Sequence, residues 1–93
     1  MTDYELMLIL RPDLEEQQTG DAIKQVSDLL DKSKVKVVNQ EFWGKRKFEY
    51  DIEGFSSGLY IIFSLQAPPS EIKLLRDKLK MDDRVIRFMI TAT

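Results

Sequence analysis

Hydrophobic residues recur along the chain with two different periods, and the period changes from one block to the next. Residues 4–10 (YELMLIL) are nearly continuously apolar, which is typical of a strand buried on both faces. From 14 to 32 the apolar residues Ile23, Val26 and Leu30 follow helical spacing, and acidic residues gather in the first turns, where the helix dipole favours them. The first third of the chain therefore predicts a strand followed by a helix.

The rest of the chain continues this alternation. Residues 35–52 are rich in β-branched and aromatic side chains and predict a long strand, and 53–58 (EGFSSG) predicts a turn. A second nearly continuous apolar run, 59–65, predicts another interior strand that ends before two prolines. Apolar residues at i, i+3 and i+7 indicate an amphipathic helix over 70–80, and 85–91 predicts a last strand.

The order strand, helix, strand, strand, helix, strand predicts an α+β fold of the ferredoxin-like βαββαβ type. In this sandwich a four-stranded antiparallel sheet carries two helices on one face, with the first and third strands in the centre and the other two at the edges. The two nearly continuous apolar runs are the first and third strands, as that arrangement requires. The opposite sheet face has no helix, so its apolar side chains must meet solvent or a partner.

Composition narrows the classes of function. A chain of 93 residues has the size of a single domain, which we expect over 1–93. Cysteine and histidine are both absent, which removes the commonest metal ligands and the commonest general base. No nucleophile and base pair is evident, so we expect neither an enzyme nor a cofactor or metal. Without a signal peptide or an apolar run of about 20 residues, the expected location is the cytoplasm, and an organelle remains open as the alternative.

The charge is unevenly distributed. The formal net charge is -2, yet residues 34–50 hold five Lys or Arg against two acidic residues, a local charge of +3. Three of the five are consecutive, Lys45, Arg46 and Lys47, and they lie in the aromatic stretch FWGKRKFEY of the predicted second strand. Local potential matters more than net charge in the choice of a partner.

Two interpretations of this basic stretch remain open. Strict alternation would place Phe42 and Arg46 on one side of the strand and Trp43, Lys45 and Lys47 on the other, so the three cations do not share a face. Charge on an edge strand prevents edge-to-edge aggregation. Cations on both faces of an edge can also hold a phosphate backbone, with Trp43 stacking on a base or ribose. The glycine after Trp43 indicates either a bulge or a close approach of another backbone.

Other sites are less well supported by the residues. Asp82 and Asp83 fit solvated turn positions better than a metal site. Tyr60 and Phe63 on the third predicted strand suit core packing or a protein contact better than base stacking, because the basic, glycine and aromatic pattern of RNA-recognition motifs is missing. A small-ligand-binding regulatory domain of the ACT type, or an oligomeric scaffold, shares the βαββαβ plan and is the alternative function.

Four segments together resemble one known family. YELMLILRPDL, WGKRKFEYDI, GLYIIFSLQAP and VIRFMI are similar, in order and spacing, to bacterial small-subunit ribosomal protein six, over essentially the whole chain. The resemblance implies a ribosomal protein without catalytic activity. It implies binding to the central domain of the small-subunit ribosomal RNA, together with ribosomal protein eighteen.

The same resemblance suggests the contact residues. Lys45 and Arg46 match the family's basic pair after the aromatic and glycine step, and Arg87 matches its last-strand arginine. Further RNA-contact candidates are Lys47, Arg84 and Trp43. The surface for the protein partner is either the open sheet face around Tyr60 or the rim of the second strand with Phe48 and Tyr50. Glu49 and Asp51 surround Tyr50 with negative charge, so we expect weak RNA binding in the absence of the partner.

Overall fold

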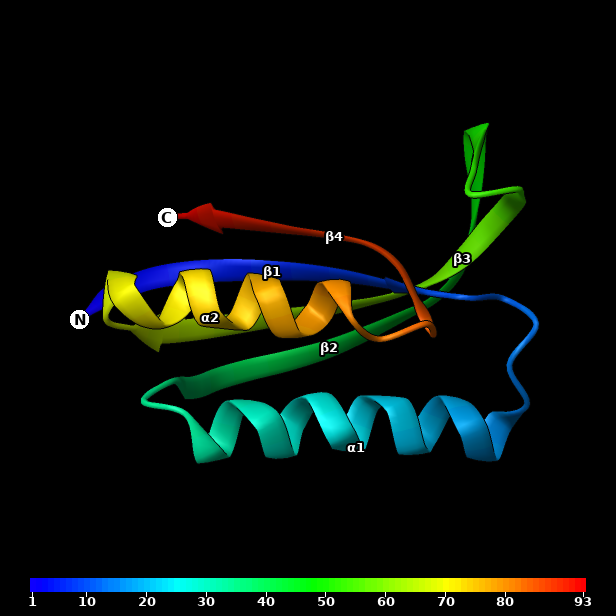
Figure 1. The fold of residues 1–93 in the computed structure, drawn as a ribbon. Coiled ribbons are helices and arrows are strands. Elements are labelled where there is room, and N and C mark those ends of the chain that lie inside the picture. Colours follow the sequence, from blue (N-terminus) through cyan, green and yellow to red (C-terminus); the bar gives the residue numbers. More distant parts are fainter.

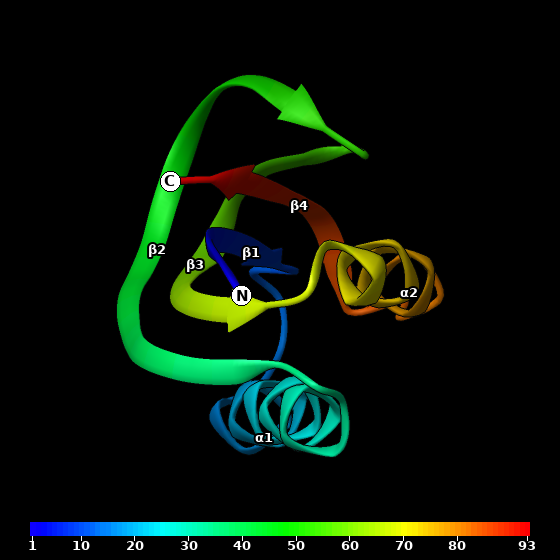
Figure 2. The same ribbon diagram turned by 90° about the vertical axis from the view of Figure 1, so that its left-hand side faces the viewer.

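The computed structural model describes residues 1–93 and contains six elements in the expected order (Figure 1). They are β1 (Thr2–Leu10), α1 (Glu16–Lys32), β2 (Lys36–Ile52), β3 (Phe55–Ala67), α2 (Pro69–Lys80) and β4 (Val85–Ala92). The strands form one antiparallel sheet in the order β2-β3-β1-β4. Both helices lie on the same side of this sheet (Figure 2). The predicted ferredoxin-like α+β fold, with the first and third strands in the centre, is confirmed.

Alternation along the two central strands separates the faces of the sheet. Every second residue of β1 and β3 points under the helices, and six of these side chains are essentially inaccessible to solvent: Leu6, Leu8, Leu10, Ile61, Phe63 and Leu65. The helices close the core with their own apolar stripes, Ala22, Val26 and Leu30 from α1 and Ile72, Leu75 and Leu79 from α2. The runs looked continuously apolar because the residues between these positions are also apolar, on the open face.

The start of α1 is fixed by a capping box. The Glu15 side chain accepts from the backbone of Gln18, and the Gln18 side chain accepts from the backbone N–H of Glu15 at 3.0 Å. The helix therefore begins at Glu16, before Thr19 and Gly20. At its other end the Ser33 hydroxyl donates to the carbonyl of Leu29 at 2.9 Å, and the Ser33 backbone N–H bonds the carbonyl of Leu30. Backbone groups at both ends of α1 thus find hydrogen-bond partners in neighbouring residues.

The prediction of a turn over residues 53–58 was too long. Only Glu53 and Gly54 form the turn, with φ of 51° and 80°, and β3 begins at Phe55. Two consecutive residues at positive φ match the right-handed twist of the flanking strands, which is why two-residue hairpins use them. Ser57 and Gly58, which look like turn residues, instead pair with Lys47 and Arg46 of β2. The resulting long hairpin extends beyond the rest of the sheet (Figure 1).

Candidate nucleic-acid interface

A β-bulge at Trp43 and Gly44 determines how the basic stretch of β2 presents its side chains. Phe42 pairs with Ile61 and Gly44 pairs with Tyr60, so β2 uses one residue more than β3 between these two pairs. Gly44 has φ of 78°, which a glycine adopts without steric cost. Of the two roles foreseen for this glycine, the bulge is the one that the structure shows.

The bulge changes which side chains share a face. Residues paired across antiparallel strands lie on the same side, so Phe42, opposite Ile61, points toward the helices, whereas Arg46, opposite Gly58, points to the open face. The expectation that Phe42 and Arg46 share a side was therefore wrong. Strict alternation fails here because the extra residue of a bulge reverses the direction of every side chain after it.

On the open face, Trp43 and Arg46 form a small stacked unit. The Arg46 guanidinium carbon lies 5.6 Å from the Trp43 ring centroid, a cation–π contact. The indole Nε1 of Trp43 donates to Oε2 of Glu41 at 3.1 Å, which orients the ring. Trp43 remains 45% exposed, so one part of its surface is available to a base, a ribose or a protein.

Lys45 and Lys47 lie on the opposite side of β2 from Arg46. Lys45 pairs with Leu59 and Lys47 with Ser57, both on the helix side of the hairpin. All three cations are exposed, and none has a carboxylate within 4.0 Å. The expectation that they do not share a face holds, and the rim of β2 carries unpaired positive charge on both sides.

Arg87 belongs to the same open face as Arg46. The register places Gly44, Tyr60, Ile9 and Arg87 in one row across all four strands. Three strand spacings separate the ends of this row, roughly 14 Å. Arg87 is exposed and makes no side-chain hydrogen bond or ion pair. Cations at both edges thus flank the apolar centre of the open face.

Aromatic and aliphatic side chains fill that centre. The Phe48 and Tyr60 rings are 6.2 Å apart and tilted by 58°, an arrangement favoured by aromatic pairs. Met7, Ile62 and Met89 continue the patch, and Met89 is 56% exposed. Phe48 and Tyr60, which stood for two different candidate partner surfaces, are therefore neighbours in one surface. Tyr50 lies farther along the hairpin, beyond this contact, and is 81% exposed.

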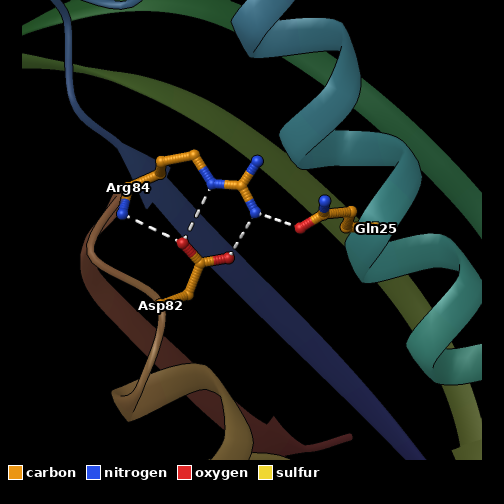
Figure 3. Close-up of polar contacts among 3 residues, drawn as sticks. All are labelled: Gln25, Asp82 and Arg84. Atoms are coloured by element: carbon orange, nitrogen blue, oxygen red, sulfur yellow. Dashed lines mark hydrogen bonds and ion pairs between the residues drawn. The ribbon is translucent and has the colours of Figure 1, made fainter.

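Arg84 is held by groups within the protein. Its guanidinium donates to both carboxylate oxygens of Asp82, at 3.0 and 2.9 Å, and to Oε1 of Gln25 on α1 (Figure 3). The Arg84 backbone N–H also donates to Asp82, at 3.0 Å. These hydrogen bonds lower the pKa of the Asp82 carboxyl and raise the pKa of Arg84. Arg84 thereby fastens the loop before β4 to α1, and its donors are less available to phosphate than those of Arg87.

Two contributors to this surface were missed in the sequence. Glu41 orients Trp43, and its position two residues earlier on the same strand could have indicated the contact. Gly58 permits Phe48 to pack onto β1, because a Cβ there would lie 2.5 Å from Ile9 and 2.8 Å from Phe48. The Ser-Ser-Gly context of Gly58 gave a turn signal, so the sequence carried no usable sign of this role.

Neither helix is long and apolar enough to cross a membrane.

Fold and surface together define the class: a ferredoxin-like domain whose open sheet face is apolar and bordered by cations. The model of the family Ribosomal protein S6 matches residues 3–92. The chain therefore belongs to the ribosomal protein S6 family, and the suspected resemblance is confirmed.

Individual relatives agree with this assignment. The chain is 33% identical to small ribosomal subunit protein bS6 of Synechocystis sp. over 96% of its length and 79% of that protein. It is 38% identical to the bS6 protein of Porphyromonas gingivalis, covering 96% and 76%. The crystal structure of 30S ribosomal protein S6 from Thermotoga maritima superposes with a TM-score of 0.94, at 24% identity, over 99% of this chain and 87% of that one. These relatives are structural ribosomal proteins, so the expectation that the chain is not an enzyme is confirmed.

Proposed function

We propose that this protein binds the central domain of the small-subunit ribosomal RNA together with ribosomal protein eighteen, as a structural component of the cytoplasmic small subunit. Membership in the ribosomal protein S6 family supports the ribosomal role and favours it over an ACT-type regulatory domain. The cations and aromatic side chains of the surface support the positions of the RNA and protein contacts. The whole chain, 1–93, acts as one binding unit in this proposal.

The observation that carries the proposal is the bulge at Gly44. By reversing the side-chain direction within β2, it puts Arg46 and Trp43 on the open face and leaves Lys45 and Lys47 on the helix side. A rim with cations on both sides can follow a phosphate backbone past the edge of the sheet. Lys45 and Arg46 are the main contacts, with Lys47 and Arg87 in support. Trp43 stacks on an exposed sugar or base.

The protein partner occupies the centre of the open face. Phe48 and Tyr60 form its core, with Met89 toward β4. Aromatic residues and methionine are enriched in interface cores, and exposed apolar patches rimmed by polar groups mark such contacts. Tyr50 extends the contact along the hairpin. With Arg46 and Arg87 at the edges of the patch, RNA and partner meet at a shared boundary, so each should strengthen the binding of the other.

The test is a salt-dependent binding titration against a central-domain ribosomal RNA fragment, with and without ribosomal protein eighteen. The variant Lys45→Ala with Arg46→Ala is compared with wild type. We expect weaker partner-dependent binding and a slope against log salt that is shallower by roughly one to two units, since each lost phosphate contact removes about 0.7 to 0.9.

A matched control separates the rim from general charge effects. The double variant Lys73→Ala with Lys80→Ala removes the same charge from exposed positions of α2. It should bind nearly as wild type does. If the two double variants bind RNA equally well, the cations of β2 make no RNA contact. Their role would then be to protect an edge strand against aggregation.

A further inference from the structure

A second group of basic residues lies where the C-terminal end of α1 packs along α2. Lys32, Lys34 and Lys78 line a pocket of about 290 Å³ between these segments, together with Ser33, Glu71, Leu74 and Leu75. Glu71 is the only acidic residue of the lining, so the formal charge of the whole lining is +2. The rim of β2 described above takes no part in this pocket.

The three ammonium groups have no partner within the protein. Each of the three lysines is exposed, and none has a carboxylate oxygen within 4.0 Å. Leu74, next to them on α2, is 55% exposed. Lys32 and Lys78 lie in the last turns of their helices, where cations favour the helix dipole. Lys34 lies outside both helices, so the dipole does not account for its place beside them.

The adjacent end of α1 is compatible with a bound anion. A helix C-terminus normally repels negative charge through its free carbonyls. Here Ser33 donates its hydroxyl hydrogen to the carbonyl of Leu29 and its backbone hydrogen to that of Leu30. Two carbonyls of the last turns of α1 are thus engaged, which reduces the repulsion of an anion at this end of the helix.

We propose that this pocket is a second contact for phosphate groups of the ribosomal RNA backbone, an inference that rests on the proposed function. Lysine ammonium groups bind phosphate as point charges without the bidentate geometry that reads a base edge. The site therefore positions the protein on RNA and is insensitive to base sequence.

The pocket shares no residue with the cations of β2, so it is a separate contact. Lys34 precedes Lys45 by eleven residues of mostly extended chain, which spans at most roughly 36 Å. Figure 1 shows the end of α1 on one side of the molecule and the tip of the β2–β3 hairpin on the other. Contacts at two separate places fix the orientation of the domain, which one rim alone leaves free to rotate.

The experiment is the same salt titration with wild type, with Lys32→Gln, Lys34→Gln, Lys78→Gln, and with a matched control, Lys24→Gln, Lys73→Gln, Lys80→Gln. The control removes three exposed charges from the same two helices, none of them from this pocket. With ribosomal protein eighteen present, the pocket variant should bind the RNA fragment at least about tenfold more weakly at 0.1 M salt. Its slope against log salt should be shallower by about two to three units. The control should stay close to wild type.

Each other outcome overturns the proposal in a recognisable way. A pocket variant that behaves as the control does shows that the lysines make no RNA contact, and the β2 rim proposal stands if Lys45→Ala with Arg46→Ala still weakens binding. A pocket variant that binds ribosomal protein eighteen more weakly in the absence of RNA identifies a protein contact instead. Wild type that does not bind the RNA with its partner removes both proposals. Equal melting temperatures of the three proteins exclude misfolding as the cause.

Discussion

The two faces of the sheet are built from the same strands and carry different tasks. Under the helices, β1 and β3 present mostly aliphatic residues and Phe63, and six of these side chains are closed to solvent. On the open face the same strands present Met7, Ile9, Tyr60 and Ile62, next to aromatic residues from β2. Both faces are apolar. What distinguishes them is the border: helices close the first face, and cations with exposed aromatic edges surround the second.

Apolar character alone does not distinguish the core face of the sheet from the open face. Ile9 and Ile62 are 6% and 5% exposed although no helix covers them, because neighbouring side chains of the curled sheet shield them. Trp43 and Met89, at the margins, are half exposed. The open face thus has a packed centre and accessible edges, which resembles the division of protein interfaces into a dry core and a polar rim.

The largest effect should come from the covered face. Phe63→Ala removes a fully buried ring from the centre of the core and should lower the free energy of unfolding by about 3–5 kcal/mol, from lost apolar burial and the cavity left behind. Urea denaturation followed by circular dichroism measures the loss. A decrease below about 1 kcal/mol would mean that the core collapses around the gap and that the two faces differ less than the structure indicates.

The next effect tests the packing of the open face. In Gly58→Ala the new Cβ would meet Ile9 at 2.5 Å, the Phe48 ring at 2.8 Å and the Leu10 carbonyl oxygen at 3.2 Å. We expect a loss of about 1–3 kcal/mol from overpacking, because the backbone atom cannot move aside. Phe48 should be displaced, so partner binding should weaken as well.

A second glycine provides the control of opposite sign. Gly20 lies inside α1, and a Cβ there has no atom within 4 Å. Gly20→Ala should therefore stabilise the protein by about 0.5–1 kcal/mol, the difference in helix propensity. If both variants shift stability in the same direction, close packing at Gly58 is not the cause.

Much of this architecture follows from residue patterns. The period of the hydrophobic pattern and the length of each block identified both helices and all four strands. The two apolar runs identified the central strands, because a strand buried on both faces has apolar residues at nearly every position. The turn over 53–58 was overestimated because Ser57 and Gly58 have turn composition but pair with β2. Composition reports local preference, and here the long hairpin overrides it.

The candidate surface was less accessible to prediction. The basic stretch was visible in the sequence, but the faces of Phe42 and Trp43 depend on a bulge that shifts the register by one residue. The role of Arg84 could not be foreseen, since Gln25 is 59 positions away in the sequence. Long-range contacts of this kind leave no periodic signal. Phe48 and Tyr60 could each be named from the sequence as candidates for a partner surface. Their contact with each other could not be predicted, because it depends on the register of β2 on β3.

A smaller effect concerns the contact that holds α1 to the loop before β4. The Asp82 carboxyl has a folded-state pKa below its usual value of 3.8 because of its hydrogen bonds with Arg84. A lowered pKa stabilises the fold above pH 3.8, and this contribution is lost as the pH falls through the folded-state pKa. Because Asp82 is partly exposed, the contribution should be under about 1 kcal/mol.

The variant Asp82→Asn isolates this contribution from the other acids. Wild type should exceed it in stability at pH 6, and the difference should shrink as the pH falls below 3.8 and through the folded-state pKa of Asp82. Chemical denaturation at several pH values measures the difference. A gap that stays constant with pH would show that the Asp82 charge contributes nothing and that shape alone holds the loop.

The smallest change in stability should come from the margin of the open face, at Met89. This side chain is 56% exposed and lies opposite Met7, on the surface proposed for the protein partner. Met89→Ala should alter the free energy of unfolding by no more than about 0.5 kcal/mol, as expected of an exposed position. It should nevertheless weaken binding of ribosomal protein eighteen several-fold in a calorimetric titration, since the methionine is buried only in the complex. One pair of measurements would then distinguish the roles of the two faces. Phe63→Ala changes the free energy of unfolding, and Met89→Ala changes the affinity for the partner. Unchanged association would move the partner away from the open face and toward Tyr50 on the hairpin.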